Sequence, residues 1–249
     1  MTTHDYSVAH FVEGALESIS HFDLRILRSA WTLLTRPGWL TRDYLSGKRR
    51  ASVGPMQLFI VMNILYALSG WNSFRTPLAI QEQDPPFTAF KQARVTSAIV
   101  KSGLNHEEFG REFNAAAGTQ GKTWILVMIP AFAGCLAALY GFRRYFFEHL
   151  VFAAHFYAFV LAVMLITSLT VTSLLLVLHL HLGSRGLDAL LSSIDLGAFI
   201  LYLFLALRRA YGDGAMASAI RAVVLAGLLT PILMAYRFLL FFVTLWAMH

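Results

Sequence analysis

The chain contains few charged residues, one cysteine and none of the short motifs of common soluble enzymes. Only 14% of its 249 residues are charged, whereas 57% are hydrophobic, and an ordinary soluble domain has about 25% charged residues. Cys135 has no second cysteine to pair with, which excludes an intrachain disulfide and a zinc ribbon. No H-E-x-x-H, G-x-S-x-G or complete phosphate-binding loop occurs. This composition indicates a protein whose solvent is lipid.

Long apolar runs predict an all-α, polytopic membrane protein. A spanning helix needs about 20 consecutive, mostly apolar residues. The runs that meet this requirement cover residues 53–74, 123–142, 150–178, 187–207 and 222–248. They predict a transmembrane domain over residues 53–249 with about five spans. We expect the loop over residues 75–122 to lie outside the cytoplasm and to contain a small helical cap, because weak helical periodicity runs through residues 89–117.

The distribution of Lys and Arg predicts the orientation in the membrane. Residues 1–52 contain seven of them, and Arg143, Arg144, Arg208 and Arg209 follow at the ends of predicted spans. Basic residues are in excess on the cytoplasmic side of membrane proteins. We therefore expect a multi-pass protein of a bacterial inner membrane, with the N-terminus in the cytoplasm and the C-terminus outside it.

Residues 1–52 are predicted to form a cytoplasmic, basic and amphipathic region. A helix is expected to begin after Asp23 and to end before Pro37. Its inward face is predicted to comprise Leu24, Leu27, Trp31 and Leu34. The basic residues expected to contact the membrane surface are Arg25, Arg28, Lys48, Arg49 and Arg50. Aromatic and leucine faces beside these cations favour anionic membrane lipids, rather than nucleic acid, as the partner.

Residues 143–159, RRYFFEHLVFAAHFYAF, bring ionisable side chains to the start of the third predicted span. The candidate functional cluster comprises Arg144, Glu148, His149 and His155. A helix would bring Arg144 within reach of Glu148, and Glu148 and His155 would share a face two turns apart. Two interpretations stay open. The segment forms a proton-handling or metal-binding pocket, or it forms an interfacial ion pair and a neutral histidine bonded to a neighbouring helix.

Two further polar features lie inside predicted spans. Asp195 and Arg237 are expected at similar depth on antiparallel helices. An unpaired arginine at a helix centre costs about 2.5–3.5 kcal/mol, so we predict an interhelical ion pair between them. Asn63 and the run Thr167–Ser173 are expected to hydrogen-bond between helices or to line a polar path.

Two motifs in the chain are shared with a known group of proteins. The first, R-P-G…Y-L-x-G-x-R…P, comprises Arg36, Pro37, Gly38, Tyr44, Leu45, Gly47, Arg49 and Pro55. The second, E-H-L-x-F-x-x-H, comprises Glu148, His149, Leu150, Phe152 and His155. Together with YRFLLFF at residues 236–242, they resemble an uncharacterised bacterial family of small inner-membrane proteins. The resemblance implies the membrane topology but no activity, and the N-terminal zinc ribbon of many members is missing here.

Three functions are compatible with these features. The first is conduction or transport of a small solute, proton or lipid-like molecule between the last three spans, for which we expect a homo-oligomer. The second is a membrane scaffold or assembly protein that uses the basic N-terminal face. The third is an intramembrane enzyme with Glu148, His149 and His155 as metal ligands or as an acid–base pair. We expect no cofactor, no metal centre outside this third case, and no nucleic-acid partner.

Overall fold

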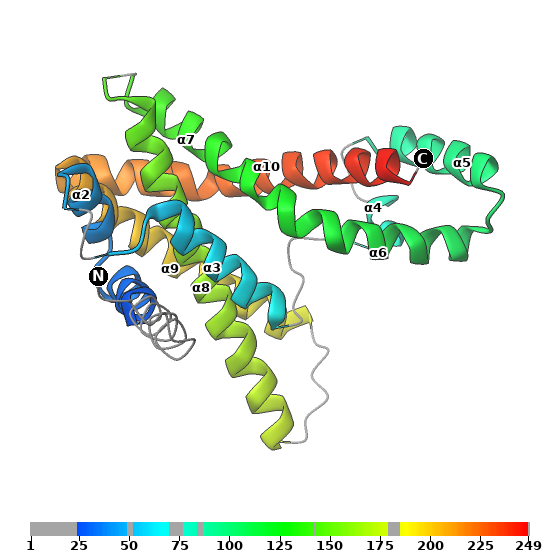
Figure 1. Cartoon of the computed structure of the whole chain (residues 1–249), viewed down its shortest axis with the longest axis horizontal. Coiled ribbons are helices and arrows are strands. Elements are labelled where there is room, and N and C mark those ends of the chain that lie inside the picture. Colours follow the sequence, from blue (N-terminus) through cyan, green and yellow to red (C-terminus); the bar gives the residue numbers. More distant parts are fainter. Residues whose placement is uncertain are drawn as a thin grey trace, which may run out of the picture. The chain divides into compact units, whose positions relative to one another are not determined.

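The described part of the protein is helical. The structure, a computed structural model, describes residues 24–48, 52–69, 77–83, 87–141, 143–178 and 185–248 (Figure 1). After a helix over residues 24–35, the elements are α2 (Trp39–Leu45), α3 (Pro55–Leu68), α4 (Leu78–Gln81), α5 (Thr88–Ser102), α6 (His106–Trp124), the 3₁₀ turn η1 (Ile125–Val127), α7 (Met128–Leu139), α8 (Phe146–Leu178), α9 (Arg185–Tyr211) and α10 (Ala215–Ala247). The all-α prediction is confirmed for these residues. Arg49, Arg50 and residues 1–23 lie outside the described residues.

Three of the described helices are long and apolar enough to cross a membrane. The qualifying segments are Phe146–Leu174 in α8, Ala189–Tyr211 in α9 and Ala215–Ala247 in α10. They correspond to the third, fourth and fifth predicted spans. A membrane location is consistent with these lengths. Helix α8 begins at Phe146, four residues before the predicted start of the third span, and Glu148 and His149 lie within it.

The first two predicted spans differ from the described helices. Helix α3 has 14 residues, fewer than the about 20 that a span needs, and residues 70–76 after it lie outside the described residues. The second predicted span belongs to a bent pair, His106–Gly121 and Ile125–Leu139, with 49° between its parts. Among the described residues there are therefore three candidate spans, or four if the bent pair is one span. The predicted number of five is not reached.

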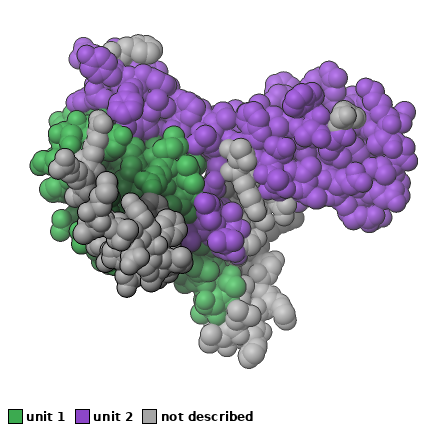
Figure 2. Space-filling model, in the orientation of Figure 1, with its two compact units in different colours: residues 1–62, 154–222 green, residues 63–153, 223–249 purple. Residues whose placement is uncertain are grey.

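The chain divides into two compact units, which Figure 2 shows in different colours. Unit 1 comprises residues 1–62 and 154–222, and unit 2 comprises residues 63–153 and 223–249. Each unit combines a segment of the chain that precedes α8 with parts of the long apolar helices. We describe the two units separately.

In unit 1, the helix over residues 24–35 buries the face opposite to the predicted one. Ile26, Ser29 and Leu33 are buried, whereas Leu24, Leu27 and Trp31 are 60%, 65% and 69% exposed, and Leu34 is half-buried. The predicted inward face is therefore wrong. Ser29 is small, so the chain at Val53 can lie close to this face. The Val53 backbone N–H donates a hydrogen bond to the Ser29 hydroxyl at 3.1 Å. The helix ends before Pro37, as predicted, and α3 begins at Pro55, two residues after the predicted start of the first span.

In unit 2, the segment predicted to contain a small helical cap forms α4, α5 and most of α6. We call these three helices the cap, and their position outside the cytoplasm stays a prediction. A buried apolar cluster joins these helices to the C-terminal end of α10 and comprises Leu78, Val95, Ala98, Phe109, Phe113, Ala117, Phe241 and Leu245. The periodic segment over residues 89–117 is two helices. Its second helix starts at a capping box, in which the Glu108 backbone N–H donates to the Asn105 side chain at 2.9 Å and the Asn105 N–H donates to the Glu108 carboxylate at 3.2 Å.

Candidate functional site

The arginine–proline–glycine motif forms a turn that touches the backbone of α9 in unit 1. Gly38 has a φ of +78° and lies at the N-terminus of α2, which packs against α9 (Figure 1). A Cβ atom at Gly38 would lie 2.7 Å from the Ala206 carbonyl oxygen and 2.8 Å from the Ala206 Cα. Both the left-handed conformation and the close approach require glycine at this position.

Side chains of α9 hold the same turn in place. Arg209 Nη1 donates a hydrogen bond to the Pro37 carbonyl at 2.9 Å. Its guanidinium carbon lies 5.8 Å from the centre of the Trp39 ring, and that of Arg42 lies 5.0 Å from the same ring. Both distances are in the range of cation–π attraction. The turn is therefore fixed by a backbone acceptor and by an aromatic ring as well as by its close fit.

His155 of α8 hydrogen-bonds a residue of α2, the helix that follows the glycine turn. Its Nδ1 lies 3.0 Å from the Thr41 hydroxyl of α2, and the exposed fractions of the two residues are only 1% and 2%. Which of the two atoms donates depends on the ring tautomer. The contact supports the interpretation of His155 as a histidine bonded to a neighbouring helix. The sequence analysis did not single out Thr41, which is 114 residues away.

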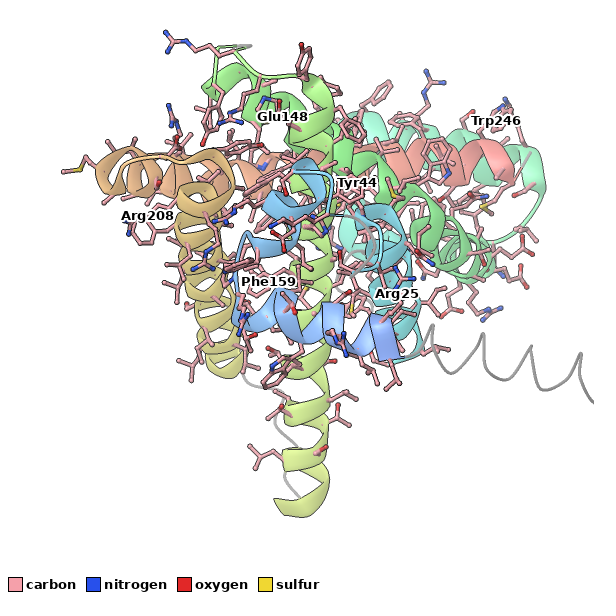
Figure 3. The ribbon with its side chains drawn as sticks, turned by 60° about the vertical axis from the view of Figure 1, so that its left-hand side comes forward. Arg25, Tyr44, Glu148, Phe159, Arg208 and Trp246 are labelled. Atoms are coloured by element: carbon pink, nitrogen blue, oxygen red, sulfur yellow. The ribbon has the colours of Figure 1, made fainter. Side chains whose placement is uncertain are left out.

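Aromatic side chains join α8 to α9 beside this contact. Phe159, labelled in Figure 3, stacks on Tyr202 with ring centres 3.9 Å apart and an interplanar angle of 22°. Phe156 also contacts Tyr202, at 6.0 Å. A hydrogen bond links the Tyr202 hydroxyl to the Gly38 backbone. Tyr202 thus connects the packing of the two long helices to the glycine turn.

We call residues 24–48 and 52–54 the N-terminal block, and its contacts with α8 and α9 the clamp.

The rest of the candidate cluster lies in unit 2. Arg144 donates to Glu148 at 2.9 Å, which is the ion pair expected from their spacing, and Glu148 is labelled in Figure 3. Their side chains are 35% and 21% exposed, so solvent screening leaves the pair weak. His149 is fully buried beside the ring of Tyr140, with ring centres 5.8 Å apart. Among the described residues, no group of three or more His, Cys, Asp or Glu side chains is placed to hold a metal ion.

Asp195 receives a hydrogen bond from the neighbouring span. Thr167 Oγ1 of α8 donates to Asp195 Oδ1 of α9 at 2.9 Å. The expected interhelical hydrogen bonding of the Thr167–Ser173 run is confirmed for Thr167. The ion pair of Asp195 with Arg237 stays a prediction.

The described members of the basic set lie on the N-terminal block. Arg25, labelled in Figure 3, is exposed and donates to the Ser52 carbonyl at 3.1 Å, while Arg28 and Lys48 are exposed. Arg25 therefore also ties the ends of the block together. Arg49 and Arg50 are outside the described residues.

Three described helices are long and apolar enough to span a membrane, and many of their large apolar side chains are exposed. The chain is therefore a candidate helical membrane protein. Residues 23–67 match a family model described as Protein of unknown function (DUF3667). The matched range contains the first motif and the whole N-terminal block, whereas the second motif at residues 148–155 and the segment 236–242 lie outside it. No curated protein and no solved structure matches the chain.

Proposed function

We propose that the chain is an integral membrane scaffold whose N-terminal block binds anionic lipid headgroups. The membrane is proposed to be a bacterial inner membrane, with the block on the cytoplasmic side and the C-terminus on the other side. One observation carries the proposal. The helix over residues 24–35, which belongs to this block, packs one face with Ile26, Ser29 and Leu33 buried and exposes an apolar and basic surface on the other.

The exposed surface has the composition of a helix that lies in the headgroup layer. Leu24, Leu27 and Trp31 follow one another at helical spacing on the exposed side. Arg28 and Arg25 are exposed beside them. Burying the apolar stripe among acyl chains leaves the arginine heads at the depth of lipid phosphates. Each Lys or Arg near an anionic surface contributes about 1 kcal/mol to binding.

The clamp gives this surface a fixed orientation within unit 1. Gly38, Thr41 and Pro37 are each held by a residue of α8 or α9, at the distances described above. Because these contacts fix the block on α8 and α9, which are candidate spans, the block cannot turn freely about these helices. A basic surface fixed on spanning helices is suited to organising lipid or a lipid-bound partner at the membrane, which is the role of a scaffold.

Three of the polar groups that favour transport have partners of a structural kind. Glu148 pairs with Arg144, His155 with Thr41, and Asp195 with Thr167. Paired groups between helices stabilise packing and need no substrate to explain them. These contacts favour the scaffold over conduction and over intramembrane catalysis.

The test measures binding of phosphatidylglycerol to the full chain in a neutral detergent, by native mass spectrometry. Replacing Arg28 with glutamine should weaken retention of this lipid about fivefold, because one surface cation is lost. The matched control is R111Q, which removes another exposed helical arginine, from α6. Retention of phosphatidylcholine should be the same in all proteins.

Two results would overturn the proposal. One is equal retention of phosphatidylglycerol by wild type and R28Q. The other is an equal loss in R28Q and R111Q, which would mean that only net charge matters. Adding K48Q to R28Q should deepen the loss, since Lys48 is a second exposed cation of the block.

A further inference from the structure

A pocket of about 310 Å³ lies between α5 and the C-terminal end of α10 in unit 2. Figure 1 shows these two helices side by side, and contact between the Phe90 and Phe242 rings at 5.8 Å joins them. The volume of the pocket is at the lower end of the range for small-molecule sites, which is about 300–1,000 Å³. The pocket has one polar wall and one apolar wall.

The polar wall comes from one face of α5. Arg94, Ser97 and Lys101 line the pocket and are spaced three and four residues apart, so they follow one another along that face. The Arg94 guanidinium lies over the Phe90 ring at 5.2 Å. Within the described ranges, neither Arg94 nor Lys101 forms an ion pair with a carboxylate. Two cations without a carboxylate partner therefore face the same pocket.

The apolar wall comes from the last turns of α10. Leu245 belongs to the buried cluster of unit 2, and Phe242 packs against that cluster. Trp246, labelled in Figure 3, also lines the pocket and is 80% exposed at the end of a candidate span. Tryptophan is enriched at this position because its ring suits the headgroup layer. The apolar wall thus extends from the protein core to the place where lipid is expected.

These two walls define the chemistry of a ligand. A simple anion would use the cations but would leave the phenylalanine and tryptophan side chains without a role. A neutral hydrocarbon would use the apolar wall but make no contact with the two exposed cations of the polar wall. We propose that the pocket binds an anionic amphiphile, with its carboxylate or phosphate head at Arg94 and Lys101 and its aliphatic chain along Phe242 and Trp246. This site does not depend on lipid binding by the N-terminal block.

Quenching of tryptophan fluorescence tests the site directly. The full chain in phosphatidylcholine nanodiscs is titrated with a stearic acid brominated at mid-chain, at a pH where the carboxylate is ionised. We expect saturable quenching, and the variant W246F should lose the saturable part because the quenched ring is missing. The methyl ester of the same acid should bind at least about tenfold more weakly, since it lacks the charge. A brominated phosphatidic acid then compares a phosphate head with the carboxylate head.

Variants of the polar wall complete the test. R94Q/K101Q should weaken binding of the acid about tenfold or more and leave the ester unchanged. The control R111Q should bind the acid as wild type does. S97F should abolish binding by filling the pocket from an exposed position, without removing a buried side chain or adding a tryptophan to the fluorescence signal. Equal binding of acid and ester by wild type, or wild-type affinity in R94Q/K101Q, would overturn the proposal and identify the pocket as a solvated groove.

Discussion

The two units hold their shorter helices against long apolar helices in different ways. In unit 1 the clamp uses backbone contact and hydrogen bonds, with the Gly38 turn on Ala206, Arg209 on Pro37 and Thr41 on His155. In unit 2 the cap is held by aromatic packing, with Phe113 against Phe241 at 5.7 Å. One attachment depends on particular atoms and the other on apolar contact area.

The difference follows from what each attachment requires. Hydrogen bonds and a glycine contact work at one register only, so the clamp of unit 1 fixes an orientation. Aromatic packing is less directional and tolerates small shifts, so the cluster of unit 2 stabilises the cap without demanding one exact position. We expect substitutions in unit 1 to act through single atoms and those in unit 2 through the volume removed.

The largest effect is expected from removing the aromatic ring at the centre of the unit 2 cluster. Phe241 is fully buried, and F241A should lower the free energy of unfolding by about 3–5 kcal/mol. The control M234A lies on the same helix and is half exposed, so it should cost under about 1 kcal/mol. Unfolding in mixed detergent micelles measures both, and amide exchange should rise over residues 88–117 in F241A. Similar costs for the two variants would refute an attachment by aromatic packing.

The next effect comes from the glycine contact of unit 1. G38A combines the strain of a left-handed residue with a clash against the α9 backbone and should cost about 2–4 kcal/mol. Gly47 is a matched control, since its φ is +84° but a Cβ there would meet nothing within 4 Å. G47A should therefore cost about 1–2 kcal/mol from strain alone. If both variants unfold at the same denaturant concentration, the contact with Ala206 contributes nothing.

The smallest of the three effects concerns the buried hydrogen bond of His155. T41V keeps the volume but removes the hydroxyl from a buried imidazole nitrogen, which should cost about 1–3 kcal/mol. T41S keeps the hydroxyl and loses one methyl group, at about 0.8 kcal/mol. Faster amide exchange in α2 should accompany T41V. A greater loss in T41S than in T41V would show that Thr41 acts by packing and not by hydrogen bonding.

Much of the helical structure could be predicted because its causes are local. Long, mostly apolar runs predict the three long helices, and Pro37 and Pro55 mark where one helix ends and another begins. The Arg144–Glu148 pair also follows from spacing along one helix. In these cases the interacting residues are within one or two turns, so a helical period is sufficient to place them.

The errors concern features that depend on distant contacts. An inward face of Leu24, Leu27, Trp31 and Leu34 follows from hydrophobicity alone, which marks the packed face reliably only where water is the solvent. Where lipid is the expected solvent, hydrophobicity no longer distinguishes the packed face from the exposed one, and the face of Ile26, Ser29 and Leu33 packs instead. The bend before α7 was also missed, because a span predicted from hydropathy carries no information about the direction of its neighbour.

The sequence alone determined that the chain is helical, that it is apolar enough for a membrane, and that its cations gather before the apolar segments. These are properties of amino-acid composition and helical periodicity, which do not depend on which residues meet in the folded protein. Tertiary structure decided that Gly38 touches Ala206, that Thr41 meets His155, and that Arg94 and Lys101 share a pocket with Trp246. Each of these pairs is far apart along the chain, so only packing of the folded units could bring them together.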